Sequence, residues 1–529
     1  MFGAVSGLYR GGRNLARLVR IGVTLARYDA LFPVLAIGDR LAGAAPLLRM
    51  TRLLRRRGGA GARPGERLAA AFNELGPSFI KLGQILSTRA DLLGEEIAED
   101  LARLQDRLPP FPGGEARALI EAEFGRPLGE LFAAFDEVPV AAASIAQVHF
   151  AVTSEGSEVA VKVLRPGIAR AFARDLDLLL WLARLVERTR PALRRLKPVE
   201  VVQTLADSVQ LEMDLRFEAA AASELAENFA GDATFRVPRV DWQRTGRTVL
   251  TIERVIGLRV DDREALVGAG HSIPDLLHHA AGAFFNQVFR DGFFHADLHP
   301  GNLFVDADGA LAVVDFGIMG RLDRQTRYYL ADMLIGFLSG DYRRVAEVHF
   351  DAGYVPPRRS IDAFTQACRS IGEPILGRPL HEISIARLLA QLFQVTEQFE
   401  METQPQLLLL QKTMVLVEGV GRRLDPTVNI WSLSRPLIEE WMRDNRGPEA
   451  RVRQQVDNLL EAIDEVPRLL RGLDRIVGDW SRGGVALHAE SLAALGAHRA
   501  RLQLILAAPL WVAAAALVAI ALAVIFGRP

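Results

Sequence analysis

The chain has 529 residues, a formal net charge of −1 and a hydrophobic content of 50%. Its length favours more than one structural unit, while the hydrophobic content is high for a purely soluble enzyme. Cys368 is the only cysteine. An intrachain disulfide and a cysteine-based zinc site are therefore excluded, and a reducing compartment is the simplest inference.

Positive charge is concentrated near the N-terminus, where residues 1–57 hold eleven Arg and two Asp. Such a surface suits phosphates, either of lipid headgroups or of nucleic acid, although a solvated basic face is an alternative. Between residues 8 and 27, Arg and apolar residues recur at roughly helical spacing, without the apolar core and cleavage site of a signal peptide. We expect residues 1–65 to form a basic amphipathic helix, on a membrane or on the folded domain, followed by a linker.

The C-terminal end contains a long apolar segment. Residues 504–526 include no charged residue, and about 20 apolar residues are enough to cross a bilayer as a helix. Arg499 and Arg501 precede the segment, and Trp511 lies near one end of it. These flanks favour interfacial anchoring and a cytoplasmic N-terminal side. We predict a transmembrane helix at 504–526 after a linker at 481–503; a buried core helix is the alternative.

The segments between these ends alternate in type. Residues 66–136 show helical patterns, and 145–164 alternate around a turn as in a β-hairpin. Further along, the pattern predicts helices at 171–190, 198–229 and 274–291, strands at 235–240 and 248–254, a strand–turn–strand unit at 303–315, and mostly helix at 325–475. We predict an α+β, bilobal nucleotide-binding fold with a helical extension (66–136), an N-lobe (137–256) and a C-lobe with further helices (257–480).

The strongest motif is H-A-D-L-H-P-G-N at residues 295–302, followed by D-F-G at residues 315–317. Phosphoryl transfer needs metal ions that bridge the phosphates and a carboxylate that positions the nucleophile. We assign Asp297 as this carboxylate, and Asn302 and Asp315 as hard oxygen ligands for Mg²⁺. The loop differs from the protein-kinase pattern H-R-D-L-x-x-x-N only by alanine in place of arginine.

A lysine with an acidic partner lies upstream of this loop. The motif V-A-V-K places Lys162 on a predicted strand between apolar residues. In kinases such a lysine pairs with the α- and β-phosphates of ATP and with a glutamate of a helix. We assign Glu218, on the next long helix, as this partner. The motif is weak alone, but together with the downstream motifs it predicts a kinase-like site for ATP and Mg²⁺.

The predicted phosphate loop departs from the kinase pattern, in which glycine lets the backbone approach phosphate closely. The corresponding stretch here consists of Ala141, Ala142, Ala143, Ser144, Ile145, Ala146, Gln147 and Val148. Alanine methyl groups keep the backbone further from phosphate. We therefore expect altered nucleotide geometry and slow or restricted phosphoryl transfer, with polar contacts from Ser144 or Gln147 in compensation.

Two further features differ from an ordinary protein kinase. No A-P-E motif follows residues 315–317, and helical sequence resumes soon afterwards, which leaves little room for docking a peptide. Before the N-lobe, a K-L-G-Q motif begins a polar stripe in which Lys81, Gln84, Thr88 and Asp91 share one helical face. Taken alone, such a stripe is usually solvent-facing.

Together these motifs resemble the atypical kinase-like family called ABC1, ADCK or UbiB, over roughly residues 70–430. The resemblance covers the K-L-G-Q motif, the alanine-rich loop, Lys162, E-M-D at 212–214 with Glu218, and both downstream motifs. It implies that the element containing Lys81 and Gln84 packs over the active site, blocks peptide substrates and contacts Glu212 and Asp214. It also implies that the C-terminal helix is a membrane anchor.

In function, the resemblance implies binding of ATP or ADP with Mg²⁺, ATPase rather than protein kinase activity, and support of ubiquinone biosynthesis. The expected location is the inner membrane, with the catalytic domain on its cytoplasmic side. Expected partners are an adenine nucleotide, a membrane lipid or quinone precursor and quinone biosynthesis enzymes, without nucleic acid; a homodimer is left open. The alternatives are a small-molecule or lipid kinase, a nucleotide-sensing scaffold, and the older interpretation as a 2-polyprenylphenol hydroxylase, for which we find no flavin fingerprint.

Overall fold

The computed structural model describes residues 17–30, 62–87, 94–102, 109–189, 198–374 and 395–427 (without 397, 402 and 403), together with residues 436, 437, 440, 441 and 443. The linker predicted at 481–503 and the transmembrane helix predicted at 504–526 lie outside these residues. In the part of the chain that is described, no helix is both long and apolar enough to cross a bilayer.

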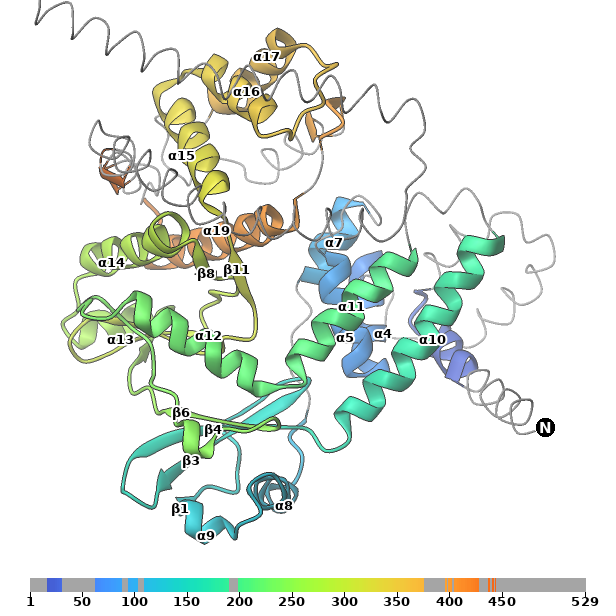
Figure 1. Ribbon diagram of the computed structural model, residues 1–529, viewed down its shortest axis with the longest axis vertical. Helices are drawn as coiled ribbons and strands as arrows, with labels where there is room; N and C mark the ends of the chain where they lie inside the picture. Colours follow the sequence, from blue (N-terminus) through green and yellow to red (C-terminus); the bar gives the residue numbers. More distant parts are fainter. Residues whose placement is uncertain are drawn as a thin grey trace, which may run out of the picture. The chain divides into compact units, whose positions relative to one another are not determined.

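The N-lobe contains a five-stranded antiparallel sheet in the order β1-β3-β4-β6, with β2 paired to β3 (Figure 1). Its strands are β1 (Phe132–Phe135), β2 (Ala141–Ala142), β3 (Ala146–Thr153), β4 (Glu158–Leu164) and β6 (Val249–Glu253). The hairpin predicted at 145–164 is β3 and β4. The sheet begins before residue 137, the predicted start of the N-lobe, because β1 ends at Phe135. Two helices, α8 (Gly113–Phe124) and α9 (Leu128–Leu131), precede β1.

The two faces of this sheet pack against different helices. On one face, Val161 and Val163 join Ala116 and Ile120 of α8 in a buried cluster. On the other face, Ala146 and Leu164 pack with residues from three helices: α10 (Ile168–Thr189), α11 (Pro198–Glu212) and α12 (Leu215–Asn228). Side chains alternate between the faces of a strand. Lys162 therefore lies on the α12 side of β4.

The helical run predicted at 198–229 is divided into two helices. Asp214 is the N-cap of α12, where its side chain accepts a hydrogen bond from the backbone N–H of Arg216 (3.2 Å). An aspartate at this position satisfies a backbone donor that has no partner within the helix. The break therefore follows from local hydrogen bonding, and it fixes the start of the helix that carries Glu218.

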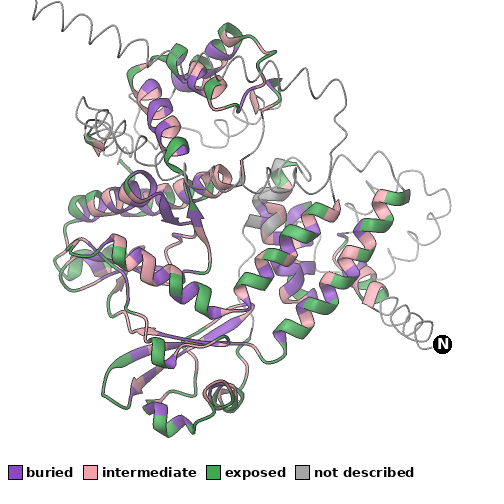
Figure 2. Ribbon diagram, viewed as in Figure 1, coloured by how far each residue is buried: buried purple, intermediate pink, exposed green. Residues whose placement is uncertain are grey.

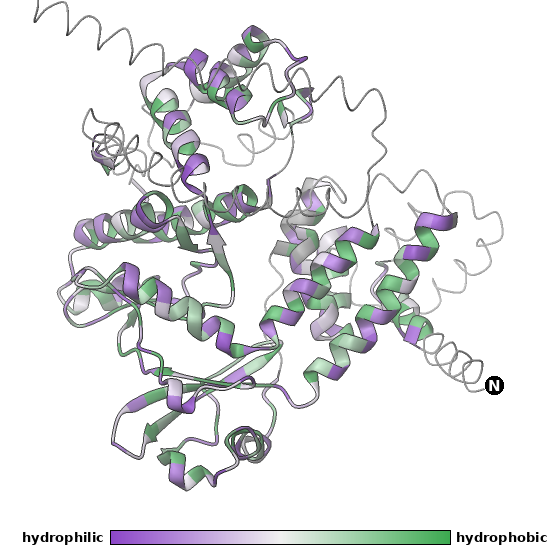
Figure 3. Ribbon diagram, in the orientation of Figure 1, coloured by the Kyte–Doolittle hydropathy of each residue, from purple (hydrophilic) through white to green (hydrophobic). Residues whose placement is uncertain are grey.

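The described part of the N-terminal extension is helical. It contains α4 (Pro64–Leu75), α5 (Pro77–Ser87) and α7 (Glu95–Ala102), which pack against one another. Residues 17–27 are also helical: Leu25 joins the α4 cluster, and Arg17 forms an ion pair with Asp175 of α10 (2.9 Å). This part of the predicted basic helix lies on the folded domain. Figure 3 shows apolar and polar residues interleaved along α10 and α11.

The C-lobe contains short strands among helices. Its four-stranded sheet has the order β5 (Phe235–Arg236), β10 (Leu311–Val313), β9 (Leu303–Val305) and β7 (Leu258–Arg259), and β8 (Phe293–His295) pairs with β11 (Met319–Arg321). The strand predicted at 235–240 is shorter than expected and runs parallel to β10. It thus belongs to the C-lobe sheet although it precedes the predicted lobe boundary.

Most of the described helices of the C-lobe pack on one large apolar core, and two of them form a separate buried cluster. The described helices are α13 (Arg263–Gly268), α14 (Ile273–Phe285), which continues as a π-helical turn (Asn286–Asp291), α15 (Arg324–Ser339), α16 (Tyr342–Asp351), α17 (Ile361–Gly372) and α19 (Pro405–Leu424). One buried cluster joins α14, α19 and the strands around residues 295–302, the segment that we call the catalytic loop. Figure 2 shows how much of α14 and of these strands is buried. The loop that carries the predicted chemistry is therefore attached to a packed core.

Candidate active site

Lys162 and Glu218 are paired between the sheet and α12. The ammonium nitrogen of Lys162 lies 2.8 and 3.0 Å from the two carboxylate oxygens of Glu218. Lys162 is placed by the β4 ladder and Glu218 by the first turn of α12, so both positions depend on regular secondary structure. The structure thus brings together the two residues that the sequence predicts as a phosphate-binding pair.

Asp315 completes a three-residue cluster. It follows β10, and its Oδ1 lies 2.7 Å from the ammonium of Lys162. Its φ is 67°, in the left-handed region that non-glycine residues rarely occupy. Such a conformation costs about 1–3 kcal/mol and is concentrated at functional sites. The backbone strain therefore coincides with the residue that is predicted to bind metal.

The two carboxyl groups of this cluster differ in pKa. Burial opposes the charge of Lys162, but the carboxylates of Asp315 and Glu218 outweigh it and raise the pKa of Lys162. Attraction by Lys162 lowers the pKa of Asp315. Burial raises the pKa of Glu218 to about 7. Asp315 is thus the firmly ionised member of the two, as a ligand for a divalent cation needs to be.

The catalytic loop runs from β8 to β9 and is fixed by His295. This histidine is fully buried; its Nε2 lies 2.9 Å from the carbonyl oxygen of Asp315, and its Nδ1 accepts a hydrogen bond from the backbone N–H of Asp297 (3.1 Å). Burial lowers the pKa of His295. A neutral ring with its proton on Nε2 satisfies both contacts. His295 therefore ties the backbones of Asp297 and Asp315 together.

Asn302 closes the same loop. Its side-chain nitrogen donates a hydrogen bond to the backbone carbonyl of Asp297 (3.1 Å). Its backbone carbonyl accepts a hydrogen bond from the backbone N–H of Val314 (3.0 Å). The amide oxygen of Asn302 and the carboxylate of Asp315 are thereby carried by connected segments. Within the described residues, no three His, Cys, Asp or Glu side chains form a group that could hold a metal. Mg²⁺ is usually held by one or two carboxylates together with substrate phosphates, so these two side chains fit Mg²⁺ bound with a nucleotide.

Asp297 has a partner that the sequence analysis did not find. The ammonium of Lys412, from α19, lies 2.9 Å from Oδ1 of Asp297. On the other side, Nε2 of His299 is 3.8 Å from Oδ2, while Nδ1 of His299 accepts the backbone N–H of Gly301 (2.9 Å). Lys412 lies in no recognisable motif, and 115 residues separate it from Asp297. No local signal in the sequence pointed to it.

The alanine-rich loop is a tight turn between β2 and β3. The backbone N–H of Ala143 donates to the carbonyl of Ala146 (2.8 Å), which encloses Ser144 and Ile145. The guanidinium of Arg165 donates two hydrogen bonds to the carbonyl of Ala143 (3.0 and 2.8 Å). Arg165 was also missed, and it holds the turn from the end of β4.

The prediction for the side chain of Gln147 is wrong. Val148, its neighbour, pairs in register with Lys162 and shares its face of the sheet. Gln147 points to the opposite face, where it exchanges two hydrogen bonds with the backbone of Phe111 (3.0 and 3.1 Å) and contacts His149 (2.9 Å). The period of two along a strand places it away from any phosphate near Lys162.

The K-L-G-Q motif lies on α5 and contacts the region before α12. The ammonium of Lys81 lies 2.6 Å from Glu212, and both side chains are nearly buried. Gln84 is half-buried on the same helix. Asp214 pairs instead with the guanidinium of Arg216 (2.6 Å) and caps α12. Of the two acidic residues expected to contact Lys81, the structure places Glu212 in contact and gives Asp214 a different partner.

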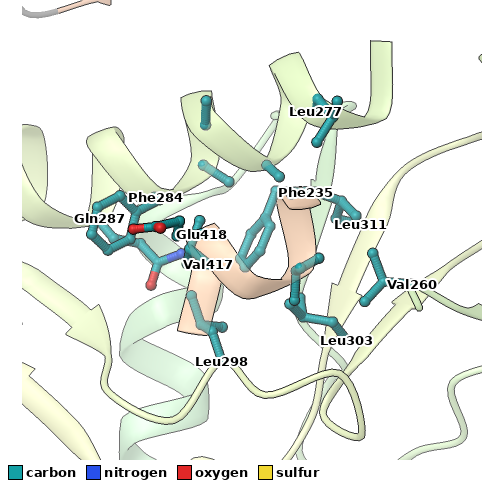
Figure 4. Close-up of a pocket in the computed structure, with 15 residues that line it drawn as sticks. Phe235, Val260, Leu277, Phe284, Gln287, Leu298, Leu303, Leu311, Val417 and Glu418 are labelled. Carbon is teal, nitrogen blue, oxygen red and sulfur yellow. The ribbon is translucent and has the colours of Figure 1, made fainter. Parts of the chain in front are cut away.

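A separate cavity lies in the C-lobe, behind the catalytic loop (Figure 4). Leu298 of that loop contributes to its wall, together with Phe235, Phe284 and Val417, and almost all of the lining is apolar. A triphosphate needs cations and backbone donors, which this lining lacks. The cavity therefore belongs to the C-lobe core and is not the candidate nucleotide site.

The chain is similar to known proteins over the same region. Residues 103–349 match the family model described as the ABC1 atypical kinase-like domain, and residues 368–429 match the UbiB helical domain. The chain is 46% identical to a "Probable protein kinase UbiB" of Marinobacter nauticus, over 77% of this chain and 76% of that protein. It is 44% identical to the protein of the same name from Azotobacter vinelandii, over 88% and 87% of the two chains.

A solved structure shows the same similarity. It is described as the complex structure of Rv3197-erythromycin from Mycobacterium tuberculosis, with 26% identity, a TM-score of 0.50, and coverage of 69% of this chain and 93% of that chain. It supports a kinase-like fold of mixed helix and sheet. Identities above 40% over most of the length of curated relatives are decisive: this chain belongs to the ABC1/UbiB family of atypical kinase-like proteins.

Proposed function

We propose that this chain is a Mg²⁺-dependent ATPase or atypical phosphotransferase that supports ubiquinone biosynthesis. The observation that carries the proposal is the cluster in which Glu218 and Asp315 both lie within 3.0 Å of the ammonium of Lys162. The name UbiB, which the relatives carry, supports the link to ubiquinone.

Each residue has a separate task in this proposal. Lys162, held by Glu218, binds the α- and β-phosphates of ATP, while Asn302 and Asp315 hold Mg²⁺. Asp297 orients the attacking group and accepts its proton on a carboxylate oxygen. Mg²⁺ held by these two side chains would supply positive charge that stabilises the negative charge developing on the phosphates. Positioning and electrostatic stabilisation provide nearly all of the rate acceleration in phosphoryl transfer.

The substrate side of the proposal rests on the ends of the chain and on α5. The apolar segment 504–526 and the arginines of residues 1–57 other than those of the helix 17–27 favour attachment to the inner membrane, with the catalytic domain on the cytoplasmic side. In this proposal the ion pair of Lys81 with Glu212 keeps α5 close to the nucleotide site, where the helix limits access by peptides. A lipid-soluble quinone precursor is then the substrate class, and ATP turnover serves its presentation or modification.

The test uses full-length protein in detergent or in vesicles that contain a prenylated phenol. Phosphate release from γ-labelled ATP and label transfer to lipid or to peptide are measured with and without Mg²⁺, for the wild type and for Asp315→Asn. We expect Mg²⁺-dependent phosphate release that the variant lacks, without label on peptide. Label on the lipid would make the chain a lipid kinase.

The same variant tests the biological part of the proposal. In cells whose only copy carries Asp315→Asn, quinone precursors should accumulate and ubiquinone should fall. Normal ubiquinone with no ATP turnover would contradict an enzymatic role and favour a nucleotide-sensing scaffold. An absorbance spectrum of the purified protein with bound flavin or iron would instead favour a hydroxylase.

A further inference from the structure

Helix α19 brings a cation to the catalytic loop. The ammonium of Lys412 lies 2.9 Å from Oδ1 of Asp297, and the side chain of Lys412 is 41% exposed. The contact joins the helical region after the kinase-like domain to the residue that we assign as the catalytic carboxylate. It is independent of every motif identified in the sequence.

The backbone beneath Lys412 is firmly anchored. Leu410, Val417 and Val420 of α19 are buried in the C-lobe core, and the neighbouring Thr413 is fully buried. The helix packs against α14 and β11, and β11 pairs with the strand that leads into the catalytic loop. The helix position is therefore set by apolar packing, while the ammonium of Lys412 stays accessible to a ligand.

A phosphate bound beside Asp297 needs a nearby cation. The catalytic loop, residues 295–302, contains neither Lys nor Arg. Lys162 is already shared between Glu218 and Asp315, and Lys81 pairs with Glu212. A terminal phosphate that reacts beside Asp297 would meet a second negative charge at close range, which is unfavourable. A cation on Asp297 offsets that repulsion, and Lys412 is positioned there.

We propose that Lys412 is the cation that binds the terminal phosphate of a nucleoside triphosphate at this site. In this structure its ammonium is held by Asp297; with a triphosphate bound, it contacts both the carboxylate and the phosphate. The inference rests on the proposed function, because it presumes a nucleotide at the cluster of Lys162. It adds a binding residue from α19 and predicts discrimination between triphosphate and diphosphate.

A purely structural role is the alternative. Lys412 and Asp297 could serve only to attach α19 to the loop. Partly exposed ion pairs contribute little to stability, and the buried apolar residues of α19 already provide attachment. A structural role predicts a loss of thermal stability and an equal effect on all nucleotides, whereas a phosphate-binding role predicts an effect on the triphosphate alone.

The experiment compares two nucleotides on the full-length protein in detergent. Calorimetric titrations with Mg²⁺ use ADP and a non-hydrolysable ATP analogue, on the wild type, Lys412→Met, Lys412→Gln and Lys412→Arg. The matched control is Arg423→Met, because Arg423 lies on the same helix and forms an exposed ion pair with Asp261 (3.1 Å). Melting temperatures of all proteins are measured in parallel.

We expect Lys412→Met and Lys412→Gln to bind the ATP analogue roughly tenfold more weakly, the loss expected for one hydrogen bond to a charged group. Binding of ADP should change less than twofold by the same reasoning. Lys412→Arg should restore most of the affinity, and Arg423→Met should resemble the wild type. Equal weakening of both nucleotides, or unchanged affinity for the analogue, would overturn the inference while leaving the proposed function intact. A wild type that binds neither nucleotide would overturn the proposed function itself.

Discussion

The ammonium of Lys162 lies 2.7 Å from Oδ1 of Asp315, although 153 residues separate the two in the chain. One of them is assigned to the phosphates and the other to the metal, so in this structure the two charges neutralise each other. Glu218 gives Lys162 a second carboxylate at 2.8 Å. The lysine therefore stays in place whichever partner Asp315 takes.

Removing this lysine should destabilise the fold, because the nearly buried carboxylate of Glu218 loses its cation. We expect Lys162→Met to lower the free energy of unfolding by about 3 kcal/mol, the loss typical of a buried pair that is broken on one side. The double variant Lys162→Met/Glu218→Met should recover part of this loss. Urea unfolding followed by circular dichroism measures both. Arg343→Met, which breaks an exposed pair with Glu347, is the control and should unfold like the wild type.

The cap of α12 links stability to the site. Asp214→Ala should cost about 1 kcal/mol of stability, a usual loss for an N-cap, and should weaken nucleotide binding because α12 carries Glu218. Asp214→Asn should restore most of both. Asp262→Ala removes a similar cap from α13, so it should lower stability without an effect on the nucleotide. If both alanine variants impair binding equally, the cap of α12 has no specific connection to the site.

The ion pair of Lys81 with Glu212 should hold α5 in place. In Lys81→Ala we expect faster hydrogen–deuterium exchange in residues 77–87, because the helix loses its nearly buried contact with α11. Exchange in β3 and β4 should not change. Arg117→Ala, which breaks an exposed pair with Glu137, is the matched control. Unaltered exchange in α5 would show that the pair does not restrain it.

His149 should make stability depend on pH. It is fully buried between Gln147, which donates to its Nε2, and the carbonyl of Asp136 (2.7 Å). Burial lowers its pKa below the ordinary value of 6.5. Below pH 6.5 the unfolded chain therefore binds a proton at this residue that the folded chain excludes. The contribution of His149 to stability is complete above pH 6.5 and falls as the pH decreases, by at most about 1.4 kcal/mol per pH unit.

The measured slope also contains the titrations of Glu218, which act in the opposite sense, and of the buried His295 and His349. The test is therefore the difference between variants: in urea unfolding between pH 7.5 and 5, His149→Gln should lose less stability on acidification than the wild type.

Local patterns predicted much of the site because its parts lie on short, regular segments. The alternation around Lys162 identified its strand, and the spacing of Asp297 and Asn302 identified their loop. The order of the motifs along the chain then favoured a bilobal fold. These features depend on residues close together in the sequence, where period and turn chemistry are informative.

The features of the site that the sequence did not predict depend on contacts between distant segments or on the exact register of a strand. Lys412 reaches Asp297 from a helix more than a hundred residues away, and Arg165 fixes a turn from the end of the neighbouring strand. The side chain of Gln147 lies on the unexpected face because the turn before it sets the register of β3. Asp214 was grouped with Glu212, but its position at a helix start gives it the ordinary task of an N-cap.

If Lys162, Asn302 and Asp315 form a nucleotide site, the purified protein should bind adenine nucleotides in a Mg²⁺-dependent way. Calorimetric titration of ADP and of a non-hydrolysable ATP analogue into the wild type should show binding that chelation of Mg²⁺ weakens by at least roughly tenfold, as expected when charge-assisted contacts to the metal are lost. Asp315→Asn should bind weakly with or without Mg²⁺. Equal affinity in the presence and absence of Mg²⁺, or no affinity for either nucleotide, would show that these residues do not form a Mg²⁺-dependent nucleotide site.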